Sequence, residues 1–86
     1  MSRNFISQEI LELVNGYYNH KSPDDGPVSE DDSFISDLTL DEWEYLAFVN
    51  VIEMQMGVKF SEKETKKLYS RNLKALIDLL CKKLDS

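Results

Sequence analysis

The chain has 86 residues, of which 42% are hydrophobic and 30% charged, and its formal net charge is −6. This length fits one domain, residues 1–86, and the composition excludes an intrinsically disordered chain. No apolar run approaches the ~20 residues of a membrane-spanning helix, so we expect no membrane insertion, and the acidic balance disfavours nucleic acid as a partner. Because Cys81 is the only cysteine and no secretion signal is visible, we expect a cytoplasmic protein without an internal disulfide.

The first expected element is an amphipathic helix from about Asn4 to His20. Its apolar residues recur at helical spacing and form one stripe, Ile6, Ile10, Leu13, Val14 and Tyr17. Asn4 or Ser7 can cap its start, and His20 fits a cap at its end. Residues 22–27, with two prolines and one glycine, predict a loop after this helix.

A second helix is expected from Asp41 to about Gly57. Asp41 and Glu44 fit a capping box at its start, and Gly57 suits the position just past its end. Its predicted buried stripe consists of Leu46, Val49, Ile52 and Met56. Before this helix, three apolar residues are expected to enter the core from the loop, namely Phe34, Ile35 and Leu38.

A short third helix is expected to open with the capping box of Ser61 and Glu64, and a last helix is expected over about residues 71–84. No alternating strand pattern competes with these helices. The sequence therefore predicts an all-α domain, a small four-helix bundle with a short third helix. The predicted core contains Ile6, Ile10, Val14, Phe34, Leu38, Leu46, Val49, Ile52, Leu68, Leu73, Ile77 and Leu80.

Candidates for catalysis or metal binding are few. His20 is the only histidine, so neither a two-histidine metal site nor a nucleophile–histidine–acid arrangement can be assembled. The acidic residues 24–32 lack the spacing and the closing glutamate of an EF-hand, and Cys81 is expected to be a packing residue. We therefore expect no enzyme, no catalytic residue, no metal site and no cofactor.

Residues 33–44, Ser-Phe-Ile-Ser-Asp-Leu-Thr-Leu-Asp-Glu-Trp-Glu, resemble the acyl carrier protein family. That family has a Ser-Phe-x-x-Asp-Leu-Gly segment, then an Asp-Ser-Leu motif that opens the second helix, a short acidic third helix and a closing helix. The order and spacing match over about residues 34–80, with two extra residues near Ser70 and Arg71. The resemblance implies the family's four-helix fold and an acidic second helix that docks on basic patches of partner enzymes.

The serine that carries phosphopantetheine in this family is missing. Glu42 stands in its place, and a carboxylate cannot form the stable phosphodiester that a hydroxyl forms. Trp43 replaces the family's small aliphatic residue, and Thr39 replaces its glycine. Ser36 precedes the helix and is interpreted as an ordinary loop serine. Glu42 is interpreted as a first-turn acid, since negative charge is favoured at a helix N-terminus.

Negative charge is concentrated in the middle of the chain. Residues 22–58 contain ten acidic residues and no lysine or arginine, whereas residues 59–86 contain eight basic and four acidic residues. Such a segment attracts a basic protein surface, although it can also be a solvated face that aids solubility. The candidate partner-binding residues are Asp41, Glu42, Trp43, Glu44, Asn50 and Glu53. Trp43, three residues before Leu46, fits either core packing or an exposed binding hot spot.

Three functions remain open from the sequence. The first is a carrier-like module that has lost its prosthetic group and binds a protein with a basic patch, such as an acyl-using enzyme. The second is an immunity protein or antitoxin that covers a basic toxin such as a nuclease, an analogy from size and charge. The third is a true acyl carrier that uses an unexpected serine.

Overall fold

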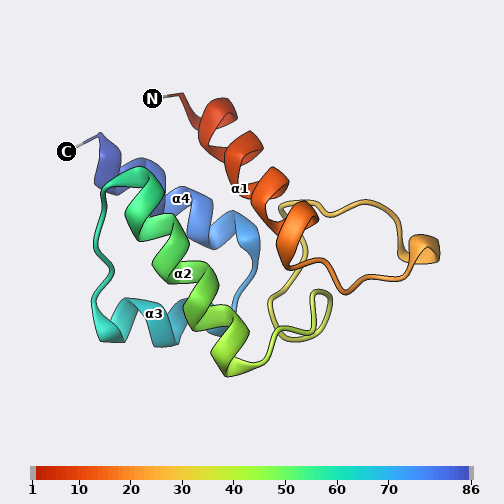
Figure 1. The fold of residues 1–86 in the computed structure, drawn as a ribbon. Helices are drawn as coiled ribbons and strands as arrows, with labels where there is room; N and C mark the ends of the chain where they lie inside the picture. Colours follow the sequence, from red (N-terminus) through yellow and green to blue (C-terminus); the bar gives the residue numbers. More distant parts are fainter. Residues whose placement is uncertain (1, 86) are drawn as a thin grey trace.

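The structure is a computed structural model that describes residues 2–85, and four α-helices enclose its core (Figure 1). They are α1 (Arg3–Tyr17), α2 (Glu42–Met56), α3 (Glu62–Tyr69) and α4 (Leu73–Leu84), and a 3₁₀ turn, η1 (Pro23–Asp25), lies between α1 and α2. Residues 2–85 form no strand, and one isolated bridge pairs Ser33 with Asn72. The predicted all-α, four-helix fold with a short third helix is confirmed.

The two predicted capping boxes open α2 and α3. The Glu44 amide donates to Asp41 Oδ1 at 2.8 Å, and the Asp41 amide donates back to the Glu44 carboxylate. Ser61 and Glu64 exchange the same pair of hydrogen bonds at the start of α3. Gly57 ends α2 in the left-handed conformation, with φ of 66°, as predicted. These local signals therefore set where both helices begin and where α2 ends.

The ends of α1 differ from the prediction. Its capping residue is Ser2, and neither Asn4 nor Ser7 has this role. The helix ends at Tyr17, which is 80% exposed and so does not belong to the buried stripe. His20 lies beyond the end of the helix and is not its cap.

All predicted core residues are buried except Leu46, which is 38% exposed. The prediction for Leu46 is wrong because α2 is rotated relative to the predicted register, and its buried residues are Tyr45, Phe48, Val49 and Ile52. The rings of Tyr45 and Phe48 decide this rotation, since each buries more apolar surface than a leucine does. The Phe34 ring packs against Tyr45 and Phe48 at centroid distances of 5.1 and 6.1 Å. Ile35, also expected in the core, is 50% exposed.

The long connection between α1 and α2 is held against α4. The backbone carbonyls of Glu30 and Asp32 accept hydrogen bonds from the first amides of α4, those of Lys74 at 2.8 Å and Leu73 at 3.0 Å. The Lys21 ammonium lies 3.0 Å from the Asp32 carboxylate, and both side chains are nearly buried. The connection is therefore fixed in place although only η1 gives it regular structure.

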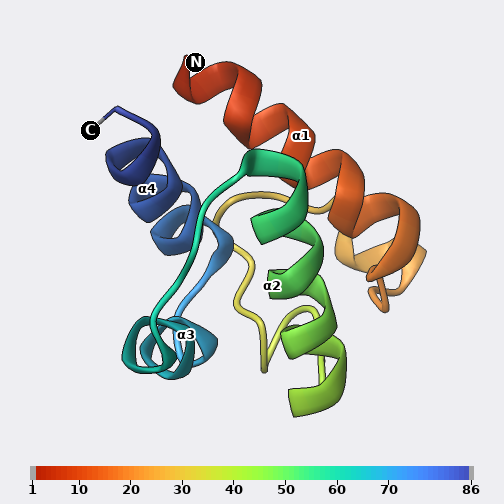
Figure 2. The ribbon, with the colours of Figure 1, turned by 60° about the vertical axis from the view of Figure 1, so that its left-hand side comes forward.

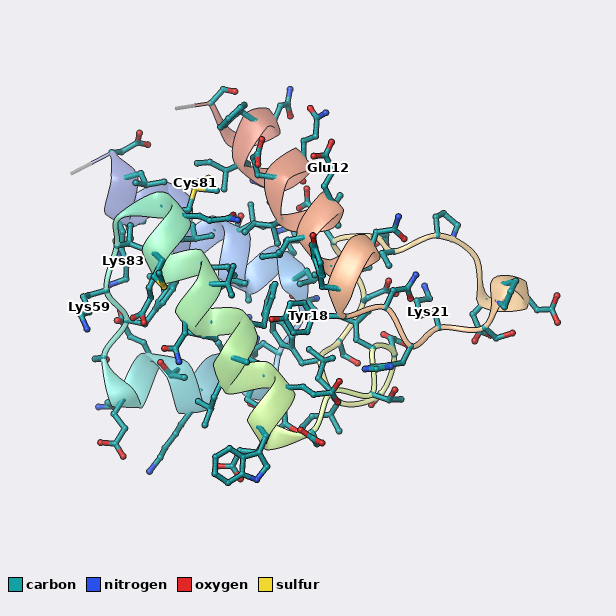
Figure 3. All side chains as sticks on the ribbon, viewed as in Figure 1. Glu12, Tyr18, Lys21, Lys59, Cys81 and Lys83 are labelled. Carbon is teal, nitrogen blue, oxygen red and sulfur yellow. The ribbon has the colours of Figure 1, made fainter. Side chains whose placement is uncertain are left out.

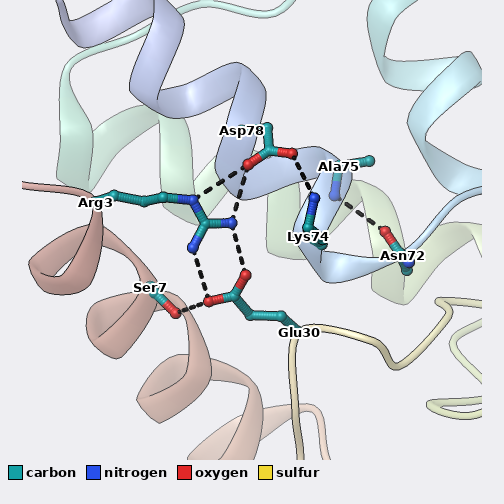
Figure 4. A network of polar contacts seen from close by, with 7 residues as sticks. All are labelled: Arg3, Ser7, Glu30, Asn72, Lys74, Ala75 and Asp78. Carbon is teal, nitrogen blue, oxygen red and sulfur yellow. Dashed lines mark hydrogen bonds and ion pairs between the residues drawn. The ribbon is translucent and has the colours of Figure 1, made fainter.

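An ionic network joins α1, this connection and α4 (Figure 4). The Arg3 guanidinium donates to Glu30 at 2.7 Å and to Asp78 at 2.9 Å, and Ser7 Oγ donates to Glu30 at 2.5 Å. Hydrogen bonds from Arg3 and Ser7 hold the pKa of Glu30 below its ordinary value. Hydrogen bonds from Arg3 lower the pKa of Asp78 in the same way. The network places the start of α1 against α4.

The two described ends of the chain lie at the same end of the molecule (Figures 1 and 2). The start of α1 and the end of α4 are close together in both views. The start of α2 lies at the opposite end in both views. The first turn of α2 is therefore far from both described ends of the chain.

Candidate protein-binding surface

One side of α2 faces solvent along the whole helix. Four exposed residues, spaced by four, three and four positions, share this side, and we call them the outer row: Trp43, Ala47, Asn50 and Met54. Trp43 is 83% exposed and Met54 is 85% exposed. Of the two environments open to Trp43, the exposed one is therefore correct. The outer row is the apolar side of α2 that the fold leaves uncovered.

The structure brings four of the six candidate residues together at the start of α2. Asp41 is the cap, and Glu42, Trp43 and Glu44 follow it in the first turn. Glu42 is exposed, at the first position of the helix, and Glu44 is half-buried. An exposed indole therefore stands among three carboxylates.

The other two candidates lie further along α2 and differ from each other. Asn50 is exposed and belongs to the outer row. Glu53 is half-buried, and its Oε2 accepts a hydrogen bond from the Phe60 amide at 2.8 Å. Glu53 therefore fixes the connection between α2 and α3, a role that spacing alone does not indicate.

Contacts from α1 and its following residues also reach this region. His20 Nε2 lies 2.6 Å from Glu44 Oε2, so the segment after α1 touches the first turn of α2. The Tyr18 ring packs edge-on against Phe48, with centroids 5.3 Å apart, between α1 and α2 (Figure 3). The nearby Lys21 pairs with Asp32, so its charge is directed to the connection and the start of α2 remains acidic.

Sequence reasoning missed Met54, Ala47 and Leu46 as parts of this surface. The available signal was the spacing from Trp43, because Met54 follows it by three turns and lies on the same side. Leu46, assigned to the core, adds an exposed apolar side chain beside the outer row. The surface is therefore longer and more apolar than predicted.

Other chemistry is sparse in the described part of the chain. Among residues 2–85, no group of three His, Cys, Asp or Glu side chains is placed to hold a metal ion. Over the same residues, no helix has both the length and the apolar character to cross a membrane. Cys81 is half-buried and packs against the core, as predicted.

Fold and surface together define a small all-α domain whose second helix exposes an aromatic and acidic start. No protein-family model matches the chain, and a search of curated proteins finds no match to it. The function is therefore inferred from the outer row and the acids around it.

Proposed function

We propose that this protein is a non-catalytic, acyl-carrier-like module without a prosthetic group, and that it binds a basic protein surface through the start of α2. One observation carries the proposal, namely that the indole of Trp43 is 83% exposed at the start of α2. Tryptophan is enriched among the residues that dominate binding energy at protein interfaces. The carboxylates of Asp41, Glu42 and Glu44 speed the encounter with a cationic surface.

The geometry around α2 supports the carrier-like part of the proposal. Thr39, at the position of the family's glycine, has φ of 52°, a conformation that glycine adopts without strain. Glu42, at the position of the family's serine, is exposed at the first position of α2. These two positions support a carrier-like domain in which a carboxylate replaces the hydroxyl needed for a phosphodiester.

A second candidate function uses the same surface. The acidic segment of residues 22–58 contains no basic residue, which also suits an immunity protein or antitoxin that covers a basic toxin. Under both functions the protein acts in the cytoplasm as a binding partner, and the identity of the bound protein separates them.

Intact mass tests whether a prosthetic group is attached. After co-expression with a broad-specificity phosphopantetheinyl transferase, we expect the parent mass to be unchanged. A gain of about 340 Da, the mass of the attached group, would instead identify a true carrier that uses another serine, with Ser36 the first to examine. Glu42→Ser is the matched variant, and its modification by the same transferase is expected if the domain descends from carriers.

Photo-crosslinking tests where the partner binds. A photoreactive amino acid is placed at position 43 in the source cells, and the matched control is position 17, where Tyr17 is 80% exposed on α1. We expect a partner with a basic surface to be captured from position 43 and not from position 17. Capture from position 17 alone would contradict the proposed surface.

A further inference from the structure

We infer that the partner presents one amphipathic helix with basic flanks, which lies lengthwise along the outer row of α2. The inference rests on the proposed function and adds the structural form of the partner to it. The spacing, size and charge of the exposed residues on α2 are the observations from which we infer this helix-on-helix packing.

The spacing of the outer row is that of a helix-packing seam. Steps of four, three and four residues are the steps between successive inward-facing positions of a coiled coil. Trp43 and Met54 stand at the two ends of the row, about 17 Å apart along the helix axis at 1.5 Å per residue. Ala47 in the middle is small, so a second helix can approach the backbone closely there. A single partner helix can therefore contact the whole row.

The residues that flank the row define the charge of this helix. Glu44 and Val51 flank one side, and Leu46 and Glu53 flank the other. The two carboxylates thus lie at diagonally opposite corners, where Glu44 also contacts His20 at 2.6 Å and Glu53 also accepts from the Phe60 amide at 2.8 Å. The two apolar side chains widen the centre. A helix with lysine or arginine at its flanking positions places positive charge near both corners. A second copy of this chain has no lysine or arginine at the corresponding flanking positions, so it lacks the positive charge that would complement the two carboxylates.

Asn50 is the one polar residue of the row. A polar side chain at an inward-facing position favours a partner that hydrogen-bonds to it and so selects one register at some cost in affinity. We therefore expect the partner helix to carry asparagine or another polar residue opposite Asn50.

Synthetic helical peptides of about three heptads test this directly, with Trp43 as the reporter because it is the only tryptophan in the chain. The first peptide has leucine and one asparagine at the inward positions and lysine at the flanking positions. The second has the same composition with the leucines spread around the helix, and the third has glutamate in place of lysine. We expect a blue shift and saturable binding with the first peptide, and at least about tenfold weaker binding with the other two. Equal binding of the first and second peptides, or no binding of the first, would overturn the inference.

Variants of the row separate this inference from the proposed function. Ala47→Arg places a bulky side chain in the middle of the row at an exposed helical position, and Tyr17→Arg is the matched control on α1. We expect Ala47→Arg, but not Tyr17→Arg, to weaken binding of the first peptide and of the crosslinked partner by about tenfold or more. If Trp43→Ala weakens partner binding and Ala47→Arg does not, the helix inference fails and the proposed function stands. If neither variant weakens partner binding, both the helix inference and the proposed function fail. If the chain instead forms a dimer that Ala47→Arg dissociates, the helix that packs on α2 belongs to a second copy of this chain and the helix inference fails.

Discussion

α4 and α2 contribute the same kind of apolar side to one core, but they differ in what they turn towards solvent. Every exposed residue of α4 is charged, namely Lys74, Asp78 and Lys82. The exposed residues of α2 include large apolar side chains, among them Trp43, Leu46 and Met54. Packing in the core accounts for which residues of α4 are buried and which are exposed. It does not account for the large apolar side chains that α2 exposes. The proposed contact with a partner through α2 accounts for these exposed apolar side chains.

The charges of the two helices differ in the same way. On α4, Asp78 pairs with Arg3 at 2.9 Å, and Lys83 pairs with Glu64 at 3.0 Å. On α2, Glu42 is exposed at the start of the helix beside Trp43. Charges on α4 thus join it to α1 and α3, whereas Glu42 at the start of α2 faces solvent.

The largest expected effect on stability comes from a substitution on the buried side of α2, compared with one on its exposed side. Phe48→Ala removes a fully buried ring that packs against Tyr18 and Phe34, and we expect the free energy of unfolding to fall by about 3–5 kcal/mol. Leu46→Ala removes a partly exposed side chain and is expected to cost about 1 kcal/mol or less. Urea denaturation of both variants measures the difference. Equal costs would mean that the register of α2 is not the one described.

A smaller effect is expected in the ionic network that holds α4. The pKa of Glu30 is lowered in the folded state, so its carboxylate stabilises the fold above its unfolded pKa of about 4.3 and loses this contribution as the pH falls through the folded value. We expect Glu30→Gln to cost about 1 kcal/mol at neutral pH. The gap between variant and parent is expected to close as the pH falls from about 5 towards 3.

Denaturation at a series of pH values measures that gap. Asp24→Asn, at an exposed position of η1, is the control and is expected to follow the parent at every pH. A constant gap between Glu30→Gln and the parent would mean that the charge of Glu30 does not contribute.

A substitution at Thr39, two residues before the cap Asp41 of α2, is expected to raise the free energy of unfolding. Thr39 has φ of 52°, which is costly for a β-branched residue, so Thr39→Gly relieves strain while adding freedom to the unfolded chain. We expect a net gain of about 0.5–1 kcal/mol. Thr39→Ala keeps a Cβ atom at this φ and is the control, expected to give no such gain. A loss of stability in Thr39→Gly would show that the threonine side chain has a stabilising role.

The smallest effect on stability is expected at Trp43. Because the side chain is 83% exposed, Trp43→Ala is expected to change the free energy of unfolding by about 0.5 kcal/mol or less. Binding to the crosslinked partner is expected to weaken by about 2 kcal/mol or more. Calorimetry on the same variant measures both quantities, and unfolding of the variant would place Trp43 in the core.

The comparison of α2 with α4 also explains what could be predicted from the sequence. In α4 the exposed charged residues Lys74, Asp78 and Lys82 recur every four positions on one side, so the buried positions Leu73, Ile77 and Leu80 on the other side follow from spacing. In α2 apolar residues occur on all sides, so spacing permits several registers, and packing against Phe34 selects one. The start of the candidate site was predictable because Asp41 and Glu44 form a local capping box. The role of Glu53 was not, since it depends on where the chain brings the Phe60 amide.

The placement of the two chain ends has a practical consequence for studying and engineering this domain. Both described ends lie away from the first turn of α2 (Figures 1 and 2). A fluorescent protein, an affinity label or a surface tether can therefore be fused ahead of α1 or after α4 without covering Trp43. Because the two ends are also close to each other, a short linker can join them, and new termini can be opened in the exposed residues near η1. Such a circular permutant would present α2 unchanged from a different point of attachment.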